Sequence, residues 1–427
     1  MPLGARAAGD AVSVAVATAA AAGAPGTGDG RAAFGLRRPL VGRDGQVAGF
    51  ELRFAAALES RLGDRADDAA AAQATALMTA ARLGTAGGRQ VLLSLPGALL
   101  DRPAIQQQAT QGVWLGWRGG TPRAASLAAL RARGARVGAP EGAPEQMPAG
   151  AADFVWLRAQ GAGLDTLLLA AQRWREAHRT LAVVATGLGG VDEIEQALRG
   201  GVALAGGDLG CGAAAPAARP LGAAAHRICE LLNHLALDRD TVLVADAVRG
   251  DTALTYRLLR YANSAAIGLK RSVTTVDDAV TMLGRSELQR WLTVQLMSAA
   301  ASRQASRALE EAALARGRVL EAVARRRGDA SPGTHFTLGM LSLMEPLLQV
   351  PLASALAPLR LGDAAGDALL RRAGPWADRL QLLDAIDAGD EAKVGALCGT
   401  LGVGDDLDQI VEAAWRWAAQ VRQSADK

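Results

Sequence analysis

Short apolar runs alternate with helical patterns from about Phe34 to residue 209, and this alternation constrains the fold more than any other feature. Strands are predicted at 46–54, 91–95, 113–117, 135–139, 153–158, 181–187 and 202–207, and helices at 67–83, 122–133, 162–178 and 191–199. Pro122 suits the first turn of its helix. Strands that alternate with helices form parallel sheets. The pattern predicts an α/β barrel or a doubly wound sheet.

The strand signal disappears from His226 onward, and helix signals become sharper. Asp251 is placed to cap a helix that carries Leu254 and Tyr261 on one face, with Gly268 shortly beyond its end. This part of the chain is predicted to be all-helical.

Two further helices are marked by their ends. Thr275 and Asp278 have the spacing of a capping box in its acidic variant, and Gly284 is a suitable residue for ending that helix. A second helix is predicted to begin at Ser286, with Leu288, Trp291, Leu292 and Leu296 on one stripe.

The chain is therefore divided into a tail, two domains and a connection. Residues 1–30 are interpreted as a disordered Ala/Gly-rich tail, 31–209 as the barrel, 210–220 as a Pro-bearing linker and 221–420 as the helical domain. The alanine-rich run at 11–23 is too weakly apolar for a signal peptide, and no stretch is apolar enough for a membrane span. We expect a soluble protein.

Charge and cysteine usage exclude several classes of function. The net charge is +3, and the arginines are interleaved with Asp and Glu, which argues against nucleic-acid binding. Cys211, Cys229 and Cys398 are far apart and have no metal-ligand spacing, so neither a disulfide framework nor a zinc site is predicted. A reducing, cytoplasmic location is expected.

The stretch at 251–292, DTALTYRLLRYANSAAIGLKRSVTTVDDAVTMLGRSELQRWL, strongly resembles the core of HDOD domains. The resemblance continues through FTLGMLSLMEPLL at 336–348 and ALLRRAGPWADRLQLL at 368–383. HDOD domains are all-helical output modules of bacterial signalling proteins, distantly related to the HD phosphohydrolases. The resemblance implies a module that acts through a protein partner.

The N-terminal half resembles, more weakly, the EAL-type barrel that hydrolyses cyclic diguanylate. RRPLVGRDGQVAGFELRF is similar to the opening of EAL domains that are fused to HDOD domains, and Glu51 falls at the position of the family's motif glutamate. The order of the two domains also agrees. The resemblance implies a site in which carboxylates and an asparagine hold two divalent ions beside a lysine.

The other positions of the EAL site do not carry the expected ligands. They are occupied by Ser94, Trp114, Trp117, Pro140, Glu141, Trp156 and Arg158, and the family's Gln-Gly-Tyr corresponds to Ala205, Gly206 and Gly207. Residues 1–214 contain neither asparagine nor lysine. We therefore interpret Glu51 as vestigial, a carboxylate paired with Arg53 or Arg37, and expect no catalytic residue, metal ligand or cofactor.

The helical domain lacks the metal motif of the HD phosphohydrolases, because none of its histidines is followed by aspartate. The HDOD-like core instead offers five candidate interaction residues: Arg257, Arg260, Asn263, Ser264 and Arg290. A solvated arginine face is the simpler explanation of the arginines, and a turn-closing amide that of Asn263. The tryptophan pairs 114/117 and 415/417 are interpreted as packing residues.

These observations predict a non-catalytic bacterial signalling protein, in which a degenerate EAL-like barrel is joined to an HDOD domain that binds another protein. Two alternatives stay open. The barrel could bind cyclic diguanylate weakly without hydrolysing it, or it could be a phosphodiesterase with a metal site rebuilt from Glu51, Glu141 and Asp153. The second requires those three carboxylates to converge.

Overall fold

A computed structural model describes most of the chain. The described residues are 34–62, 68–84, 88–139, 144, 147, 150–159, 163–210, 221–237, 239, 241–264, 267, 273–299 and 303–426. The predicted tail, all but Gly210 of the predicted linker, and the predicted helix-ending Gly268 lie outside them. The chain forms two compact units, the first comprising Met1–Cys211, Asp384–Thr400 and Gly404–Asp408, the second comprising Gly212–Leu383, Leu401–Val403 and Gln409–Lys427.

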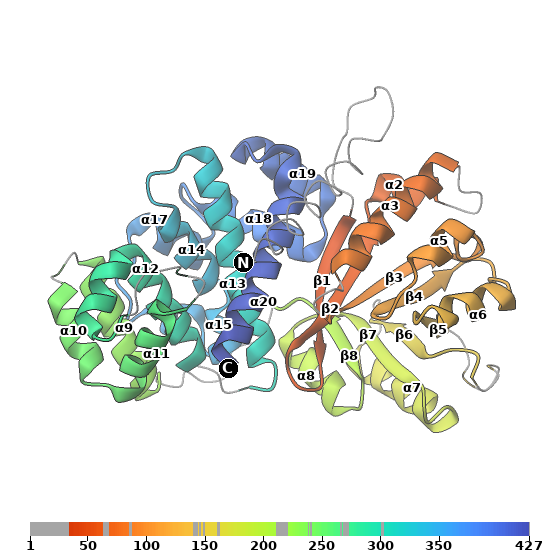
Figure 1. The fold of residues 1–427 in the computed structure, drawn as a ribbon, viewed down its shortest axis with the longest axis horizontal. Helices are drawn as coiled ribbons and strands as arrows, with labels where there is room; N and C mark the ends of the chain where they lie inside the picture. Colours follow the sequence, from red (N-terminus) through yellow and green to blue (C-terminus); the bar gives the residue numbers. More distant parts are fainter. Residues whose placement is uncertain are drawn as a thin grey trace, which may run out of the picture. The chain divides into compact units, whose positions relative to one another are not determined.

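The first unit is a closed barrel in which each strand pairs with the next and β8 pairs with β1. Its strands are β1 (Phe34–Gly42), β2 (Val47–Phe54), β3 (Gln90–Pro96), β4 (Val113–Arg118), β5 (Arg136–Ala139), β6 (Phe154–Arg158), β7 (Ala182–Leu188) and β8 (Leu204–Gly207). Its helices before the helical unit are α2 (Ala56–Arg61), α3 (Asp68–Gly84), α4 (Gly97–Leu100), α5 (Pro103–Gln108), α6 (Ala124–Ala132), α7 (Leu164–Ala177) and α8 (Val191–Arg199). In Figure 1 these helices lie around the outside of the strands. The predicted barrel is confirmed.

The strand at 34–42 was not predicted, and it does not follow the parallel arrangement of the others. β1 runs antiparallel to both β2 and β8, whereas β2 to β8 pair in parallel. The cause is the tight β1–β2 turn, where Gly45 has φ +74° and Asp44 Oδ1 accepts a hydrogen bond from the Gln46 amide at 3.1 Å. Asp-Gly is a strong hairpin signal. A two-stranded hairpin forces antiparallel pairing.

Helix α6 also begins later than predicted. Its first residue is Ala124, so Pro122 lies before the first turn and not within it. The Arg123 amide is held by Asp101 Oδ1 at 2.9 Å, which fixes the chain just before the helix.

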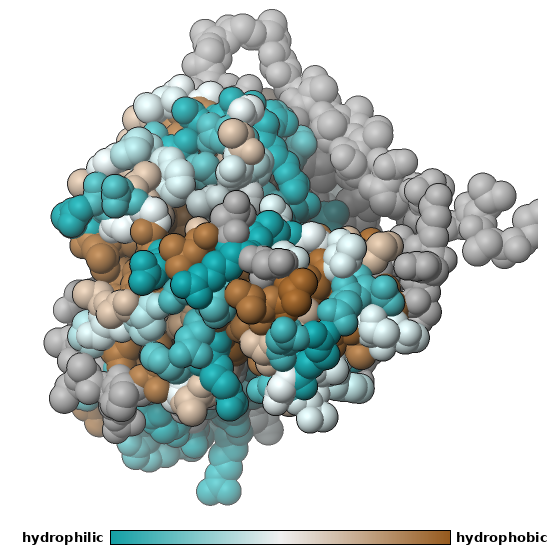
Figure 2. Space-filling view, turned by 90° about the vertical axis from the view of Figure 1, so that its left-hand side faces the viewer, coloured by the Kyte–Doolittle hydropathy of each residue, from teal (hydrophilic) through white to brown (hydrophobic). Residues whose placement is uncertain are grey.

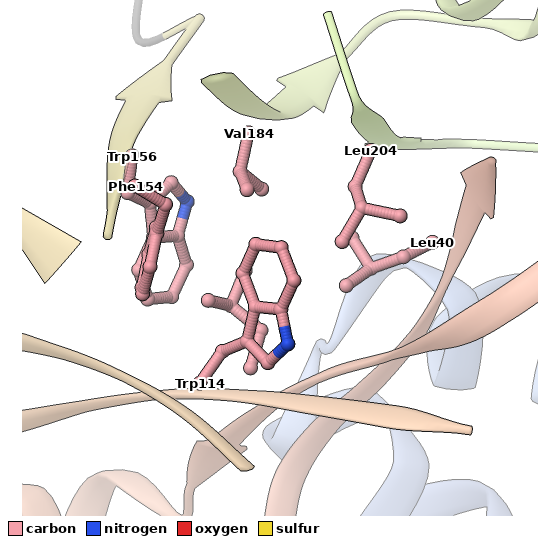
Figure 3. Packing of buried hydrophobic residues seen from close by; sticks show 7 residues of the cluster. Leu40, Trp114, Phe154, Trp156, Val184 and Leu204 are labelled. Carbon is pink, nitrogen blue, oxygen red and sulfur yellow. The ribbon is translucent and has the colours of Figure 1, made fainter. Parts of the chain in front are cut away.

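The barrel interior is filled by apolar side chains that point toward one another (Figure 3). They are Leu40, Leu92, Trp114, Phe154, Trp156, Val184 and Leu204. Large rings lie opposite glycines: a Cβ added to Gly138 would come within 2.7 Å of the Phe154 ring, and one added to Gly116 within 2.9 Å of Trp156 Cε3. The glycines thus provide the space that the two rings occupy.

The second unit consists of helices in the part of the chain that the structure describes. They are α9 (Ala223–Ala236), α10 (Thr241–Arg249), α11 (Thr252–Ala262), α12 (Val276–Ala299), α13 (Ser306–Arg327), α14 (Pro332–Leu341), α15 (Met344–Leu348), α16 (Leu352–Leu356) and α17 (Asp363–Arg371). The chain then enters α18 (Ala377–Ala388), α19 (Glu391–Leu401) and α20 (Leu407–Asp426), each of which has residues in both units. No helix among the described residues has the length and apolar character needed to cross a membrane.

The predicted helix ends are found in the structure. Asp251 accepts hydrogen bonds from the amides of Ala253 and Leu254, both at 3.0 Å. Thr275 Oγ1 accepts one from the Asp278 amide at 3.1 Å. Gly284 has φ +69° and interrupts α12, so the helix that begins near Ser286 is a separate segment, as predicted.

Helix α13 lies at the centre of the second unit, with most of its residues buried. It packs closely on α14 because both helices have a glycine at the contact. A Cβ on Gly317 would lie 2.8 Å from the Phe336 carbonyl oxygen, and one on Gly339 would lie 2.7 Å from the Arg316 backbone. The two backbones can approach only because neither position has a side chain.

Candidate functional site

Glu51 lies inside the barrel, toward the carboxyl ends of the parallel strands. It pairs with Arg38 of β1 and with Leu92 of β3, and Leu92 belongs to the interior cluster. Residues that lie opposite each other on neighbouring strands point to the same face of the sheet. Active sites of (β/α) barrels form at this carboxyl-end rim, which we call the barrel mouth. Glu51 is therefore where the resemblance requires the motif glutamate.

The surroundings of Glu51 are cationic. Burial raises the pKa of its carboxyl, and the guanidinium groups of Arg38, Arg158 and Arg53 and the Thr186 hydroxyl oppose this shift. The register partner of Glu51 on β1 is Arg38, which the sequence did not single out. Of the two predicted partners, Arg53 acts on the carboxyl, more weakly than Arg38 and Arg158. Among the described residues, Oε2 of Glu51 is buried without a hydrogen-bond partner.

Trp156 fills the space beside this carboxylate. Its indole N–H donates a buried hydrogen bond of 2.8 Å to Thr186 Oγ1, and its ring lies over Gly116. The Arg158 guanidinium carbon lies 4.5 Å from the centre of the Trp156 ring, which is a cation–π distance. An aromatic ring and a cation thus occupy the positions at which the EAL resemblance calls for lysine and aspartate.

Ser94 lies at the strand position where the EAL resemblance calls for asparagine, and it takes part in a structural contact. The backbone carbonyl of Ser94 accepts a hydrogen bond of 2.8 Å from Arg118, and Arg118 also forms an ion pair with Glu59 of α2. Burial raises the pKa of Glu59, with Arg118 as the main opposing influence. Sequence reasoning missed this pair, because neither residue stands at a motif position.

Two of the three carboxylates of the alternative rebuilt site, Glu51 and Asp153, do not converge. Asp153 accepts hydrogen bonds from Arg131 Nε of α6 at 2.9 Å and from the Val137 amide at 2.7 Å, so its side chain faces the outer helices, away from Glu51. Glu141 lies outside the described residues. In the described ranges, no group of three His, Cys, Asp or Glu side chains is arranged to hold a metal ion.

In the helical unit, Asn263 has a structural role. Its Nδ2 donates to the carbonyls of Leu259 and Val273, at 2.8 and 2.7 Å, and its Oδ1 accepts from the Val273 amide at 2.7 Å. The side chain thereby closes the connection after α11, which confirms the turn-closing interpretation. The Ser264 hydroxyl is buried beside it without a partner in the described part of the chain.

The candidate arginines do not form one surface. Arg257 donates to Gln295 Oε1 at 2.9 Å across α11 and α12. Arg260 also interacts with another group of the protein. Arg290 has a side chain only 14% exposed, and it pairs with Glu321 and Glu287 inside the helical unit. The structure therefore separates Arg290 from the exposed positions.

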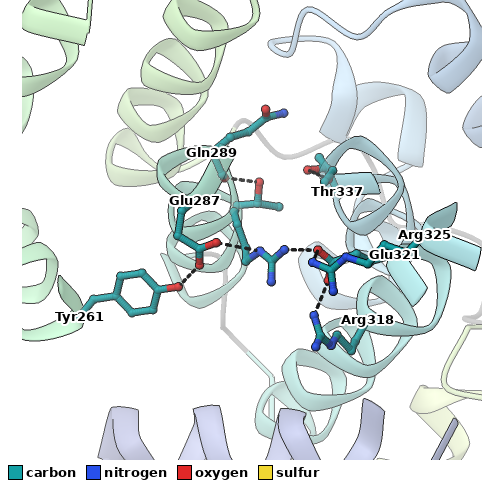
Figure 4. Close-up of polar contacts among 10 residues, drawn as sticks. Tyr261, Glu287, Gln289, Arg318, Glu321, Arg325 and Thr337 are labelled. Carbon is teal, nitrogen blue, oxygen red and sulfur yellow. Dashed lines mark hydrogen bonds and ion pairs between the residues drawn. The ribbon is translucent and has the colours of Figure 1, made fainter. Parts of the chain in front are cut away.

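Arg290 belongs to a buried network that the sequence did not reveal (Figure 4). Glu321 of α13 is 1% exposed and pairs with Arg290 and, at 2.7 Å each, with Arg318 and Arg325. Glu287 links Arg290 to the hydroxyl of Tyr261, whose pKa is raised by burial and by that carboxylate. Arg318, Glu321 and Arg325 have the spacing of ordinary surface pairs, so only their burial distinguishes them.

The helical unit also has exposed apolar side chains. Leu237, Val242, Leu243, Tyr256 and Met282 are between 43% and 64% exposed on α10, α11, α12 and the end of α9. Figure 2, which views the side of Figure 1 where these helices lie, shows apolar patches separated by polar side chains. Such patches are typical of protein interaction surfaces.

Comparison with known proteins identifies the second unit. Residues 220–353 match the family described as the HDOD domain. The protein thus has an HDOD domain after a closed α/β barrel, which is the class of two-domain signalling protein that its sequence resembles.

Two curated relatives match the chain. It is 27% identical over 187 residues to the uncharacterized protein YuxH of Bacillus subtilis, which is 43% of this chain and 44% of that protein. It is 27% identical over 186 residues to the cyclic di-GMP phosphodiesterase CdgJ of Vibrio cholerae, 43% of each. The chain therefore matches less than half the length of these relatives.

Solved structures similar to the chain include EAL enzymes. The cAMP-bound form of the EAL enzyme Bd1971 has 11% sequence identity and a TM-score of 0.32, covering 41% of this chain and 61% of that one. A calcium and cyclic diGMP complex of Klebsiella pneumoniae BlrP1 has 17% identity and a TM-score of 0.31, covering 41% and 53%. The barrel itself is established by the strand pairing described above.

Proposed function

We propose that this protein is a cytoplasmic bacterial signalling protein whose barrel does not hydrolyse cyclic diguanylate and whose HDOD domain acts by binding a protein partner. The observation that carries the proposal is the position of Trp156. Its ring and the Arg158 guanidinium fill the interior beside Glu51, where a hydrolase of the EAL type needs room and oxygen ligands for metal ions.

The chemistry of Glu51 supports the same conclusion. Its neighbours are arginines, which repel divalent cations. A single carboxylate also competes poorly with the water molecules that Mg²⁺ retains. Asp153, the second carboxylate of the rebuilt site, faces the outer helices.

The proposed role of the HDOD domain is supported by its surface. Five large apolar side chains are exposed on α9 to α12. Covering them with a partner would remove apolar surface from water, which favours association. The candidate arginines take part in contacts within the domain, so we assign recognition to this apolar surface in preference to an arginine cluster.

The deciding experiment measures hydrolysis directly. The purified full chain is incubated with cyclic diguanylate and Mg²⁺ or Mn²⁺, and the nucleotide is then separated by chromatography, with CdgJ of Vibrio cholerae as the positive control. We expect the nucleotide to stay cyclic. Linear product that disappears in a Glu51→Gln variant would overturn the proposal.

A second candidate function is a receptor for a cyclic dinucleotide. It is favoured by the guanidinium groups of Arg38 and Arg158 beside Glu51, because arginine binds phosphate well. Calorimetric titration separates the two candidates. Micromolar binding that is lost in Arg158→Ala would establish the receptor, whereas no heat would leave the protein-binding role.

A further inference from the structure

A segment that follows the HDOD match belongs to the barrel unit. Asp384–Thr400 is grouped with the barrel, although the family match ends at residue 353. The division falls within α18, after Leu383. We call Asp384–Thr400 the C-terminal strap.

The strap binds the barrel through three side chains. Both carboxylate oxygens of Glu391 lie 3.0 Å from the Ala56 amide, at the beginning of α2. Arg53 of β2 donates to the carbonyl of Gly389 at 3.3 Å, and Arg38 of β1 donates to that of Asp387 at 3.1 Å. The first amides of a helix have no partner within the helix, so Glu391 satisfies a donor that α2 itself leaves free.

The two surfaces also fit sterically. Any side chain on Gly35 would overlap the Glu391 carboxylate. Gly389 has φ +69°, and a Cβ there would come within 2.7 Å of Leu36 Cδ1. A side chain at position 35 would displace the Glu391 carboxylate, and the left-handed backbone at position 389 favours glycine.

The contact lies at the barrel mouth. β2 runs parallel to β3, so its carboxyl end, from Arg53 to the start of α2, forms part of the mouth. Arg38 is common to both features: it donates to the strap, and it is the strongest opposing charge on the Glu51 carboxylate.

We propose that the C-terminal strap is an intramolecular clamp that closes the β1–β2 side of the barrel mouth and is coupled through Arg38 to the interior around Glu51. Through α18 the strap is covalently continuous with the helical unit. This inference does not depend on whether the barrel hydrolyses a nucleotide.

Hydrogen exchange of the full chain tests the clamp. Removing the cap in Glu391→Ala should increase exchange at the Ala56 amide by about three- to thirtyfold, the effect of losing a helix cap. Gly35→Ala should have a similar effect from the barrel side. Glu391→Gln retains an acceptor and should stay close to the parent. Asp68→Ala, which removes a 98% exposed carboxylate at the start of another barrel helix, is the matched control.

Coupling through Arg38 is tested by a double-mutant cycle. Arg38→Gln should increase exchange both in peptides from the strap and at Ala56. Combined with Glu391→Ala, it should give less than the product of the two separate increases, because either change already releases the strap. Unchanged exchange in the single variants would disprove docking, and independent multiplicative effects would disprove the clamp.

Discussion

At the scale of single residues, the barrel interior depends on the Thr186 hydroxyl. It accepts the indole N–H of Trp156 and also interacts with the Glu51 carboxyl. A buried donor that loses its acceptor keeps its desolvation cost, whereas a solvated one does not. Replacing Thr186 is therefore expected to destabilise the barrel more than the small size of its side chain indicates.

Thr186→Val should lower the free energy of unfolding by about 1–3 kcal/mol, because it leaves the Trp156 N–H buried without an acceptor. Urea denaturation followed by tryptophan fluorescence measures the change. Thr75→Val is the control, since the Thr75 hydroxyl only bonds the Ala71 carbonyl within its own helix, and a loss within about 0.5 kcal/mol is expected. Equal losses in the two variants would argue against the Trp156 contact.

His335 provides a prediction on pH. It is 3% exposed, and its Nε2 has no hydrogen-bond partner among the residues described. Burial lowers its pKa and the Arg379 charge adds to this shift, while the Ser331 carbonyl and the Asp329 carboxylate oppose it. Below pH 6.5, the ordinary pKa of histidine, this imidazole is protonated in the unfolded chain but stays neutral in the folded chain. The free energy of unfolding therefore falls as the pH is lowered from 6.5 toward the folded pKa.

Denaturation curves between pH 7 and 5 measure this dependence. His335→Gln should flatten the part of the decline that the buried imidazole causes. The control is His226→Gln, because the His226 side chain is 58% exposed and its replacement removes no buried imidazole. A parent and a His335→Gln variant with the same pH slope would contradict the assignment.

At the scale of elements, the sequence predicts what local chemistry determines. Asp251 and Thr275 identify helix starts because their oxygens cap nearby amides, and Gly284 identifies an end because it adopts a positive φ. Long-range features were missed. Nothing in a sequence spacing shows that Glu321 is buried, or that β1 is the antiparallel strand that closes the barrel.

The α13–α14 contact gives the prediction for elements. Gly339→Ala should destabilise the helical unit by about 1–3 kcal/mol, since its Cβ would press against the Arg316 backbone. Gly333→Ala in the same helix meets no atom within 4 Å and should be neutral or stabilising by up to about 1 kcal/mol. Thermal unfolding compares the pair. A stable Gly339→Ala protein would show that the two helices can separate freely.

At the scale of the whole molecule, the residue types of the candidate site could be predicted from the sequence, but their arrangement in space could not. The sequence showed at which positions of the EAL resemblance the expected ligand types are absent, because side-chain chemistry is read directly from residue types. It did not show how the side chains at these positions pack, since the approach of Trp156 to Gly116 and of Arg38 to Glu51 is set by barrel closure. It also gave no sign that the barrel includes residues from beyond the HDOD match.

The position of the strap in the chain has a consequence for biosynthesis. Domains of a nascent chain generally fold in order from the N-terminus. Here the barrel strands emerge from the ribosome first, but the carboxylate that caps α2 is at residue 391, after the whole HDOD match. The eight strands can therefore pair before the strap exists, but the amide at the start of α2 gains its Glu391 partner only after the helical unit has been synthesised.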